Sequence, residues 1–145
     1  MGLLTSTTPL QASASKLKGL TFDGQYTRVL DSLKALPEFS EVRDAQIRLL
    51  LTHVGTRMEN GSPAWDDPDG ACLQQLRDTT WHGLLTAHTH QPVCGLIGEA
   101  PYPVVQGKWH GNYIGILKVS VDTLTMRVTR VVPELCPVEA DRPLS

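Results

Sequence analysis

The chain has 145 residues, a length that corresponds to one domain and permits a substantial buried core. It is 41% hydrophobic and 19% charged with a net charge of −2, which excludes collagen, coiled coil and wholesale disorder. The low charge, with no basic block, argues against a nucleic acid polymer as partner, and no apolar run reaches the roughly 18 residues that would span a membrane.

The first quarter of the chain predicts a strand, a loop and a helix. Residues 3–5 are an apolar start typical of a strand, and residues 6–18, rich in Thr, Ser, Gln and Ala, indicate an irregular surface loop. Residues 20–22 form a second short extended piece, and Asp23 stands where a helix N-cap would. Apolar residues at helical spacing follow, namely Tyr26, Val29, Leu30, Leu33 and Leu36. Pro37 is predicted to end this helix, because proline cannot continue the hydrogen-bond ladder.

Two short apolar runs mark the middle of the chain. The first, residues 47–51, does not alternate with polar residues, which predicts a strand buried on both faces as in a parallel sheet. Residues 59–70 contain Asn-Gly, Ser-Pro and Asp-Pro and predict a loop. A short helix is expected around Cys72, Leu73 and Leu76, before the second apolar run at residues 83–87. Each run therefore ends just before a histidine-containing segment.

The last third of the chain predicts β structure. Residues 103–105 have the composition of a strand, and residues 113–121 and 125–132 are rich in β-branched side chains. The latter two flank Asp122-Thr123-Leu124 and predict an antiparallel hairpin. Residues 133–145 contain three prolines and are expected to form an irregular tail. The predicted class is α/β, with a β ending.

Three of the five histidines stand just beyond the carboxyl ends of the two apolar runs: His53, His88 and His90. Ligand sites form at that edge of an open α/β sheet, and neutral imidazole is the commonest metal ligand. His88 and His90 flank Thr89, which is expected to shape the turn, and in an extended segment both rings would point to the same side. With His53 as a third ligand, the pattern predicts an open metal site that accepts water or phosphate.

The alternative is structural, since two histidines at strand ends can simply hydrogen-bond loop carbonyls and an H-x-H pattern is common by chance. His82 and His110 lack a strand-end pairing and are interpreted as surface or packed residues. The acidic segment 66–70 lacks the ligand spacing of a calcium loop and is interpreted as a solvated turn. The sequon at residues 60–62 is interpreted as a turn, and Cys94 as a small apolar residue rather than a nucleophile.

Four segments, in this order, carry a family resemblance. They are Leu3-Leu4-Thr5-Ser6-Thr7-Thr8-Pro9, then Leu49-Leu50-Leu51-Thr52-His53-Val54-Gly55, then Leu85-Thr86-Ala87-His88-Thr89-His90, and finally Val104-Val105-Gln106 followed by Gly111-Asn112-Tyr113-Ile114-Gly115-Ile116-Leu117. Over residues 3–132 the chain resembles the C-terminal half of a calcineurin-like metallophosphoesterase domain. The subgroup is the 5′-nucleotidase type, which includes UDP-sugar hydrolases and 2′,3′-cyclic nucleotide phosphodiesterases.

The resemblance implies a two-metal site that hydrolyses phosphate esters such as nucleotides. It implies that His53 and His88 bind one ion and His90 the other. The family's remaining ligands come from an Asp-x-His, a Gly-Asp and an Asn-His, and none of these occurs in this sequence. Three imidazoles bring no negative charge to offset a second cation, so at most one divalent ion (Zn, Mn, Mg or similar) is expected for this chain alone.

The expected architecture is therefore a partial metallophosphoesterase domain over residues 1–132, part of a β-sandwich flanked by helices, with the irregular tail at 133–145. The expected function is that of a phosphoester hydrolase fragment, inactive until a complementing N-terminal half-domain supplies the missing ligands. Two alternatives remain: an inactive half-domain that binds metal or a partner, and a small structural module. The family's nucleotide-stacking C-terminal domain is also not represented in the sequence.

Location and redox state are inferred from what the sequence lacks. No basic and apolar leader is readable at the start, so a cytoplasmic location is expected, although typical relatives in the family are exported. The three cysteines are far apart and without C-x-x-C spacing, which supports neither a closed disulfide set nor a cysteine zinc knuckle.

Overall fold

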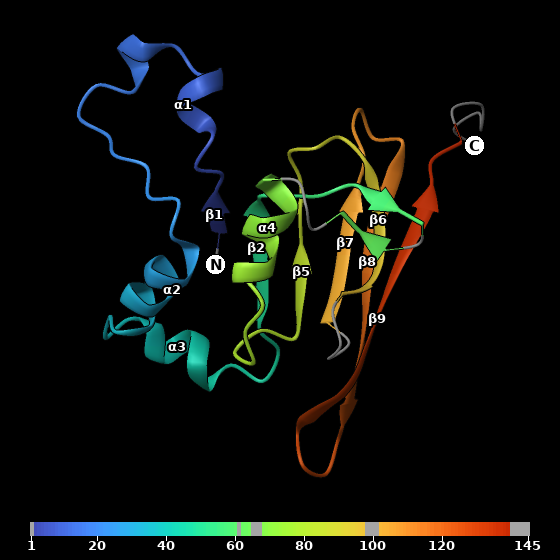
Figure 1. Ribbon diagram of the computed structural model, residues 1–145. Coiled ribbons are helices and arrows are strands. Elements are labelled where there is room, and N and C mark those ends of the chain that lie inside the picture. Colours follow the sequence, from blue (N-terminus) through green and yellow to red (C-terminus); the bar gives the residue numbers. More distant parts are fainter. Residues whose placement is uncertain (1, 61, 65–67, 98–101, 140–145) are drawn as a thin grey trace, which may run out of the picture.

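A five-stranded sheet forms the centre of the computed structural model, which describes residues 2–60, 62–64, 68–97 and 102–139 (Figure 1). In spatial order its strands are β1 (Gly2–Leu4), β2 (Leu49–His53), β5 (Gly83–Leu85), β7 (Tyr102–Gly107) and β6 (Pro92–Ile97). The first four run parallel to one another, and β6 pairs antiparallel with β7 at one edge. The apolar runs thus form the parallel strands that were expected.

Helices cover one face of this sheet. They are α2 (Tyr26–Lys34), α3 (Phe39–Asp44) and α4 (Pro68–Gln75), preceded in the chain by the short α1 (Thr8–Gln11) and a 3-10 turn at Ala14–Lys16. Their apolar side chains and those of the strands belong to one buried cluster, which includes Tyr26, Leu30, Phe39, Leu73, Leu50, Leu84 and Val104. This cluster is the hydrophobic core of the described chain.

A two-stranded hairpin, β8 (Tyr113–Asp122) and β9 (Arg127–Pro137), covers part of the opposite face. Leu117 lies over Gly83, where an added Cβ would be 3.0 Å from the leucine Cδ1. Gly115 lies over Val105 at the same close spacing. Strands β5 and β7 are therefore enclosed between the helices and the hairpin, as layers around one core require.

The hairpin does not extend over β1 and β2. Leu4 is 64% exposed and Leu51 is 53% exposed, and both project from the face opposite the helices. A shallow groove of about 400 Å³ runs along these strands, with Leu85 and His53 among its lining residues. We refer to the side chains of Leu4, Leu51, His53 and Leu85 as the open face.

This arrangement corrects the prediction that residues 47–51 form a strand buried on both faces. The strand runs from Leu49 to His53, with Leu50 fully buried and Leu51 half exposed. Ile47 precedes the strand and is 45% exposed. The prediction was wrong because an apolar run favours a strand without fixing what covers it, and the hairpin that covers the opposite face of the sheet does not extend to β2.

Several local predictions also need correction. The loop expected at residues 6–18 contains α1 and the 3-10 turn, and residues 20–22 form no strand. Asp23 does not cap α2; its carboxylate accepts the Gln25 backbone N–H at 2.8 Å, which makes a turn just before the helix. The loop expected at residues 59–70 includes a small hairpin of β3 (Met58–Glu59) and β4 (Ser62–Pro63) and the start of α4.

The tail expected to be irregular from residue 133 instead continues β9 to Pro137. Pro133 pairs with Leu117 and Pro137 with Tyr113. Proline is tolerated there because, among the described strands, β8 and β9 pair only with each other and each keeps one unpaired edge. Residues 140–145 lie outside the described part of the chain. No helix within the described residues is long and apolar enough to cross a membrane.

Candidate functional site

Three histidines converge at the carboxyl edge of the parallel sheet. His53 is the last residue of β2, and His88 and His90 lie in the loop that follows β5. The His53 and His88 ring centroids are 5.2 Å apart and their planes are inclined by 65°. Together with His90 they line a cavity of about 280 Å³, whose other walls are Ala87, Lys108, Trp109 and His110. We call this the histidine cavity.

The loop that carries His88 and His90 is not extended. Their φ angles are 85° and 57°, both in the left-handed region that non-glycine residues rarely adopt. The prediction that strand-like alternation places the two rings on one side was therefore wrong in its geometry. The rings reach the same cavity because the chain turns sharply on either side of Thr89.

Thr89 and Gln106 hold this turn in place. The Thr89 hydroxyl donates to the Thr56 carbonyl at 2.6 Å, and the Gln106 amide donates to the Thr89 oxygen at 2.7 Å and to the Gln91 carbonyl at 2.6 Å. Gln106 is only 1% exposed, so these bonds replace the water that its amide N–H groups lose on burial. Its side-chain oxygen has no hydrogen-bond partner among the described residues. A role for Thr89 in the turn was expected from the sequence, whereas Gln106 was recognised there only as part of a strand motif.

Gly55 allows the segment after β2 to pass against the histidine loop. A Cβ at this position would lie 2.0 Å from the Ala87 carbonyl oxygen and 2.2 Å from the Gln106 side-chain oxygen. Any larger residue would push the His53 segment and the His88 loop apart. The glycine two residues after His53 is therefore required sterically, because the segments that follow β2 and β5 pass very close to each other here.

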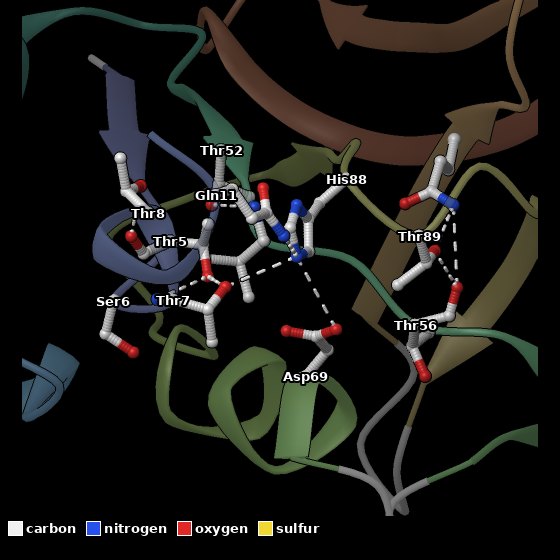
Figure 2. Close-up of polar contacts among 12 residues, drawn as sticks. Thr5, Ser6, Thr7, Thr8, Gln11, Thr52, Thr56, Asp69, His88 and Thr89 are labelled. Carbon is white, nitrogen blue, oxygen red and sulfur yellow. Dashed lines mark hydrogen bonds and ion pairs between the residues drawn. The ribbon is translucent and has the colours of Figure 1, made fainter. Parts of the chain in front are cut away.

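His88 lies against polar groups of two helices (Figure 2). Its Nε2 is 3.4 Å from the Thr7 hydroxyl, 3.5 Å from the Gln11 amide and 3.8 Å from a carboxylate oxygen of Asp69. Asp69 lies in the first turn of α4 and its side chain is 24% exposed. The interpretation of residues 66–70 as a solvated turn is therefore wrong at Asp69; residues 66 and 67 are not among the described residues.

Electrostatics favours neutral imidazole at His53. Partial burial lowers the pKa of His53 from its ordinary value, and the neighbouring His88 and His90 lower it further. The neutral ring is the form that binds a metal ion. His53 is therefore held in a ligand-competent state at neutral pH.

The described residues do not by themselves complete a metal site. His53 and His88 lie close together, but within residues 2–60, 62–64, 68–97 and 102–139 no three His, Cys, Asp or Glu side chains form a group that could hold a metal ion. The ring of His90 instead stacks on Trp109, with centroids 5.6 Å apart and planes inclined by 28°. The histidines thus fit only part of a coordination shell.

The other residues considered from sequence fall in separate places. His82 is packed at the opposite edge of the sheet, where its Nδ1 accepts the Arg48 backbone N–H at 2.9 Å. His110 is exposed but lines the histidine cavity and lies 4.8 Å from the Trp109 ring, a placement that its sequence position does not reveal. Cys94 is half-buried on β6, and burial raises the pKa of its thiol, in keeping with its interpretation as a small apolar residue.

Comparison with known proteins supports the fold. No protein-family model matches the chain, and no curated protein matches it. Among solved structures, the chain is similar to a "Putative 5'-Nucleotidase from Staphylococcus aureus", crystallised with alpha-ketoglutarate, at 24% identity and a TM-score of 0.70. The likeness establishes the fold. It covers 98% of this chain but only 27% of the Staphylococcus aureus chain, so this chain has the α/β fold of one part of that protein, with the antiparallel hairpin at its end.

Proposed function

We propose that this chain is part of a metal-dependent phosphoester hydrolase of the 5′-nucleotidase type. One observation carries the proposal: the three histidines singled out from sequence line one cavity at the carboxyl edge of the sheet. A fold shared with a putative 5′-nucleotidase supports it. The substrate would be a phosphate ester, a nucleotide being the class that the neighbour's name suggests.

His53, His88 and His90 would be the protein's contribution to a divalent metal site, for Zn, Mn or Mg. A bound divalent ion of this kind polarises a phosphoryl oxygen and lowers the pKa of a water molecule. Asp69, 3.8 Å from His88, would add negative charge beside the ring and offset part of the charge of the ion. Lys108, which also lines the cavity, would attract the phosphate.

The remaining ligands would come from a complementing half-domain that packs against the open face. This face exposes Leu4 and Leu51, and His53 lines the same groove. A covering layer of apolar strands would bury these leucines and bring its own loops to the histidine cavity. The solved neighbour has further chain beyond the 27% that this chain matches. We propose neither a nucleic acid polymer nor a membrane as a partner.

A second function remains a candidate: an inactive half-domain that binds metal or a partner protein without turnover. The observation that favours it is the lack, among the described residues, of any three-ligand group that could hold a metal. A single weakly held ion at His53 and His88 would then be the whole of its metal chemistry.

Metal binding by matched variants tests the proposed ligands. Elemental analysis and competition titrations with Zn²⁺ and Mn²⁺ should give no more than one ion per chain. His53→Ala, His88→Ala and His90→Ala should each weaken binding about tenfold or more. His82→Asn is the control, because His82 is packed at the opposite edge of the sheet and should leave binding unchanged. Unchanged affinity in all three histidine variants would overturn the assignment.

Turnover separates the two functions. The full chain would be assayed with p-nitrophenyl phosphate and with adenosine monophosphate, with Mn²⁺ or Zn²⁺ added. The assay would be repeated with a polypeptide that supplies Asp-x-His, Gly-Asp and Asn-His segments. Hydrolysis that requires both polypeptides and is lost with His88→Ala would support the hydrolase. Metal binding without turnover under every condition would favour the inactive half-domain.

A further inference from the structure

Another cleft lies at the end of the sheet opposite the histidine cavity. Its volume is about 650 Å³, within the range of roughly 300–1,000 Å³ that is typical of small-molecule sites. One wall is the loop 77–82 between α4 and β5, and another is the beginning of β9, residues 128–131. Figure 1 shows the turn of the β8–β9 hairpin projecting past this end of the sheet. Because the loop leads into β5 and Tyr102 begins β7, we call this the amino-edge cleft.

Much of the lining of the amino-edge cleft is apolar. Its apolar and aromatic residues are Trp81, Leu96, Tyr102, Pro103, Val128 and Val131. Leu96 is 54% exposed, so the described chain leaves apolar surface in contact with water here. A ligand with an apolar body would remove that surface from water and gain hydrophobic stabilisation.

The cleft also carries uncompensated positive charge. Arg77 and Arg130 both line it, and neither forms an ion pair with any described residue. Asp78 is the one carboxylate among the described lining residues. It is already engaged, because it forms an ion pair with Lys34 and accepts the Thr80 backbone N–H at 2.7 Å. The two guanidinium groups are therefore left without a negative partner in the described chain.

Buried N–H groups beside the cleft lack acceptors as well. Arg77 Nε and Trp81 Nε1 are both buried and have no hydrogen-bond partner among the described residues. Trp81 is only 3% exposed, so water does not compensate its indole N–H. Buried donors without an acceptor are rare and costly. The wall that bears the unpaired charge is thus also the wall where acceptors are missing.

The loop between α4 and β5 is held by hydrogen bonds from two other segments. The Tyr102 hydroxyl donates to the carbonyls of Asp78 and Trp81, each at 3.1 Å. The Arg48 side chain donates to the Thr80 carbonyl at 2.5 Å. A wall that is fixed in this way before a ligand arrives reduces the entropy lost on binding.

We propose that the amino-edge cleft is a ligand site separate from the histidine cavity, and that it binds a small amphipathic anion with a carboxylate on an aromatic or aliphatic body. Arg77 and Arg130 attract the carboxylate, because guanidinium groups form strong charge-assisted hydrogen bonds with carboxylates. The apolar body lies against Trp81 and Leu96. The site requires neither the metal nor the histidines of the proposed function.

The tryptophan indole signals in a ¹⁵N–¹H spectrum of the full chain test the proposal directly. The probes are 2-naphthoate, 2-naphthalenemethanol, which has the same body without the charge, and acetate, which has the charge without the body. Titration with 2-naphthoate should shift the Trp81 signal and leave that of Trp109, at the histidine cavity, in place. 2-Naphthoate should bind about tenfold more tightly than the alcohol. Its advantage over acetate should be at least as large, about tenfold or more.

Variants assign the preference for the carboxylate to single residues. Arg77→Gln and Arg130→Gln should each weaken binding of 2-naphthoate severalfold, and the double variant should bind it no better than the alcohol. Arg127→Gln is the matched control, because Arg127 lies on the same strand as Arg130 but is not among the described lining residues. It should change neither affinity. Leu96→Ala should weaken both aromatic probes by the same factor. An unshifted Trp109 signal before titration confirms that each variant is folded.

Four results would overturn the proposal. They are no binding of 2-naphthoate at millimolar concentration, equal binding of 2-naphthoate and the alcohol, a preference that survives in the double arginine variant, and a shift of the Trp109 signal in place of the Trp81 signal. His88→Ala provides a further check, because it should leave the affinity for 2-naphthoate unchanged. Loss of that affinity in His88→Ala would place the anion in the histidine cavity and refute a separate site.

Discussion

The two faces of the central sheet differ in how completely they are covered. Toward the helices, Leu50 and Leu84 are fully buried in one cluster. Toward the other side, the hairpin β8–β9 covers β5 and β7, but Leu4 and Leu51 remain more than half exposed. Neighbouring residues of one strand, Leu50 and Leu51, thus have opposite environments. A continuous apolar run therefore predicts a strand, but it does not predict whether one face or both faces of that strand are buried in the described chain.

The difference also locates the site. The histidine cavity lies at the edge where both faces end, next to the part of the sheet that is left open. A partner that covered the open face would reach this edge without any rearrangement of the core. Four predictions test the contrast, from the largest expected effect to the smallest.

Truncation of Leu50 and of Leu51 should show the difference between the covered face and the open face most clearly. Leu50→Ala removes a fully buried side chain and should lower the free energy of unfolding by about 3 kcal/mol. Leu51→Ala, at a position already 53% exposed, should cost less than about 1 kcal/mol. Urea denaturation of the two variants measures both values. Equal losses would contradict the description of one face as covered and the other as open.

At the carboxyl edge of the sheet, next to the histidine cavity, the stability of the fold should be sensitive to added side-chain volume. Gly55→Ala would place a Cβ 2.0 Å from the Ala87 carbonyl oxygen, and we expect a loss of about 2 kcal/mol from the resulting displacement. Gly95→Ala is the matched control, because a Cβ there would meet nothing within 4 Å. Thermal denaturation of the pair tests the prediction, which fails if both variants melt at the temperature of the natural sequence.

The contact between hairpin and sheet should contribute less than the helical core. Leu117→Ala removes a partly buried side chain that packs over Gly83, and a loss of about 1 kcal/mol is expected. Leu124→Ala, in the exposed hairpin turn, should have no measurable effect on unfolding. If Leu117→Ala were as neutral as Leu124→Ala, the hairpin would not form a layer of the core.

The smallest expected effect is a pH dependence at the opposite edge of the sheet. Burial, assisted by the charge of Arg48, lowers the pKa of His82 below 6.5. The unfolded chain therefore binds the proton more readily, and stability that is complete above about pH 6.5 falls as the pH drops through the folded pKa. His82→Asn keeps an acceptor for the Arg48 N–H but cannot titrate, so its unfolding free energy should vary less with pH.

Unfolding at a series of pH values between about 7 and 5 measures this difference. Part of the slope should remain in His82→Asn, because the pKa of His53 is lowered as well. A slope identical to that of the natural sequence would show that His82 does not contribute.

Sequence patterns correctly predicted the strands and the hairpin that depend on local composition. The apolar runs before His53 and His88 gave parallel strands β2 and β5, and the order of elements led to the correct expectation that all three histidines lie at one edge. The β-branched segments gave the hairpin β8–β9. Each of these features follows from alternation, run length or turn residues within about ten positions of the chain.

The features that were missed depend on contacts between distant segments. The edge strand β6 has a Pro, a Gly and a Cys among its six residues and is a strand because it pairs with β7. Helix α3 follows Pro37 closely, where the pattern indicated an end, and it forms because Phe39 packs against Trp81. Neither pairing is visible in the local sequence.

The candidate site was only half predictable for the same reason. The histidines were found from their position after apolar runs. The Asp69 carboxylate beside His88 and the Trp109 ring in the cavity come from other segments, which only the fold brings there. The left-handed conformations of His88 and His90 were also missed, since nothing in the sequence of the loop signals them. Glycine would have been the usual indication.

That last feature bears on the conformational energy of the loop. With positive φ at His88 and His90, a glycine at either position would remove roughly 1 kcal/mol of backbone strain. The two heteroaromatic rings therefore stand where the backbone alone would favour glycine, and the loop presents them to the cavity at a cost in stability.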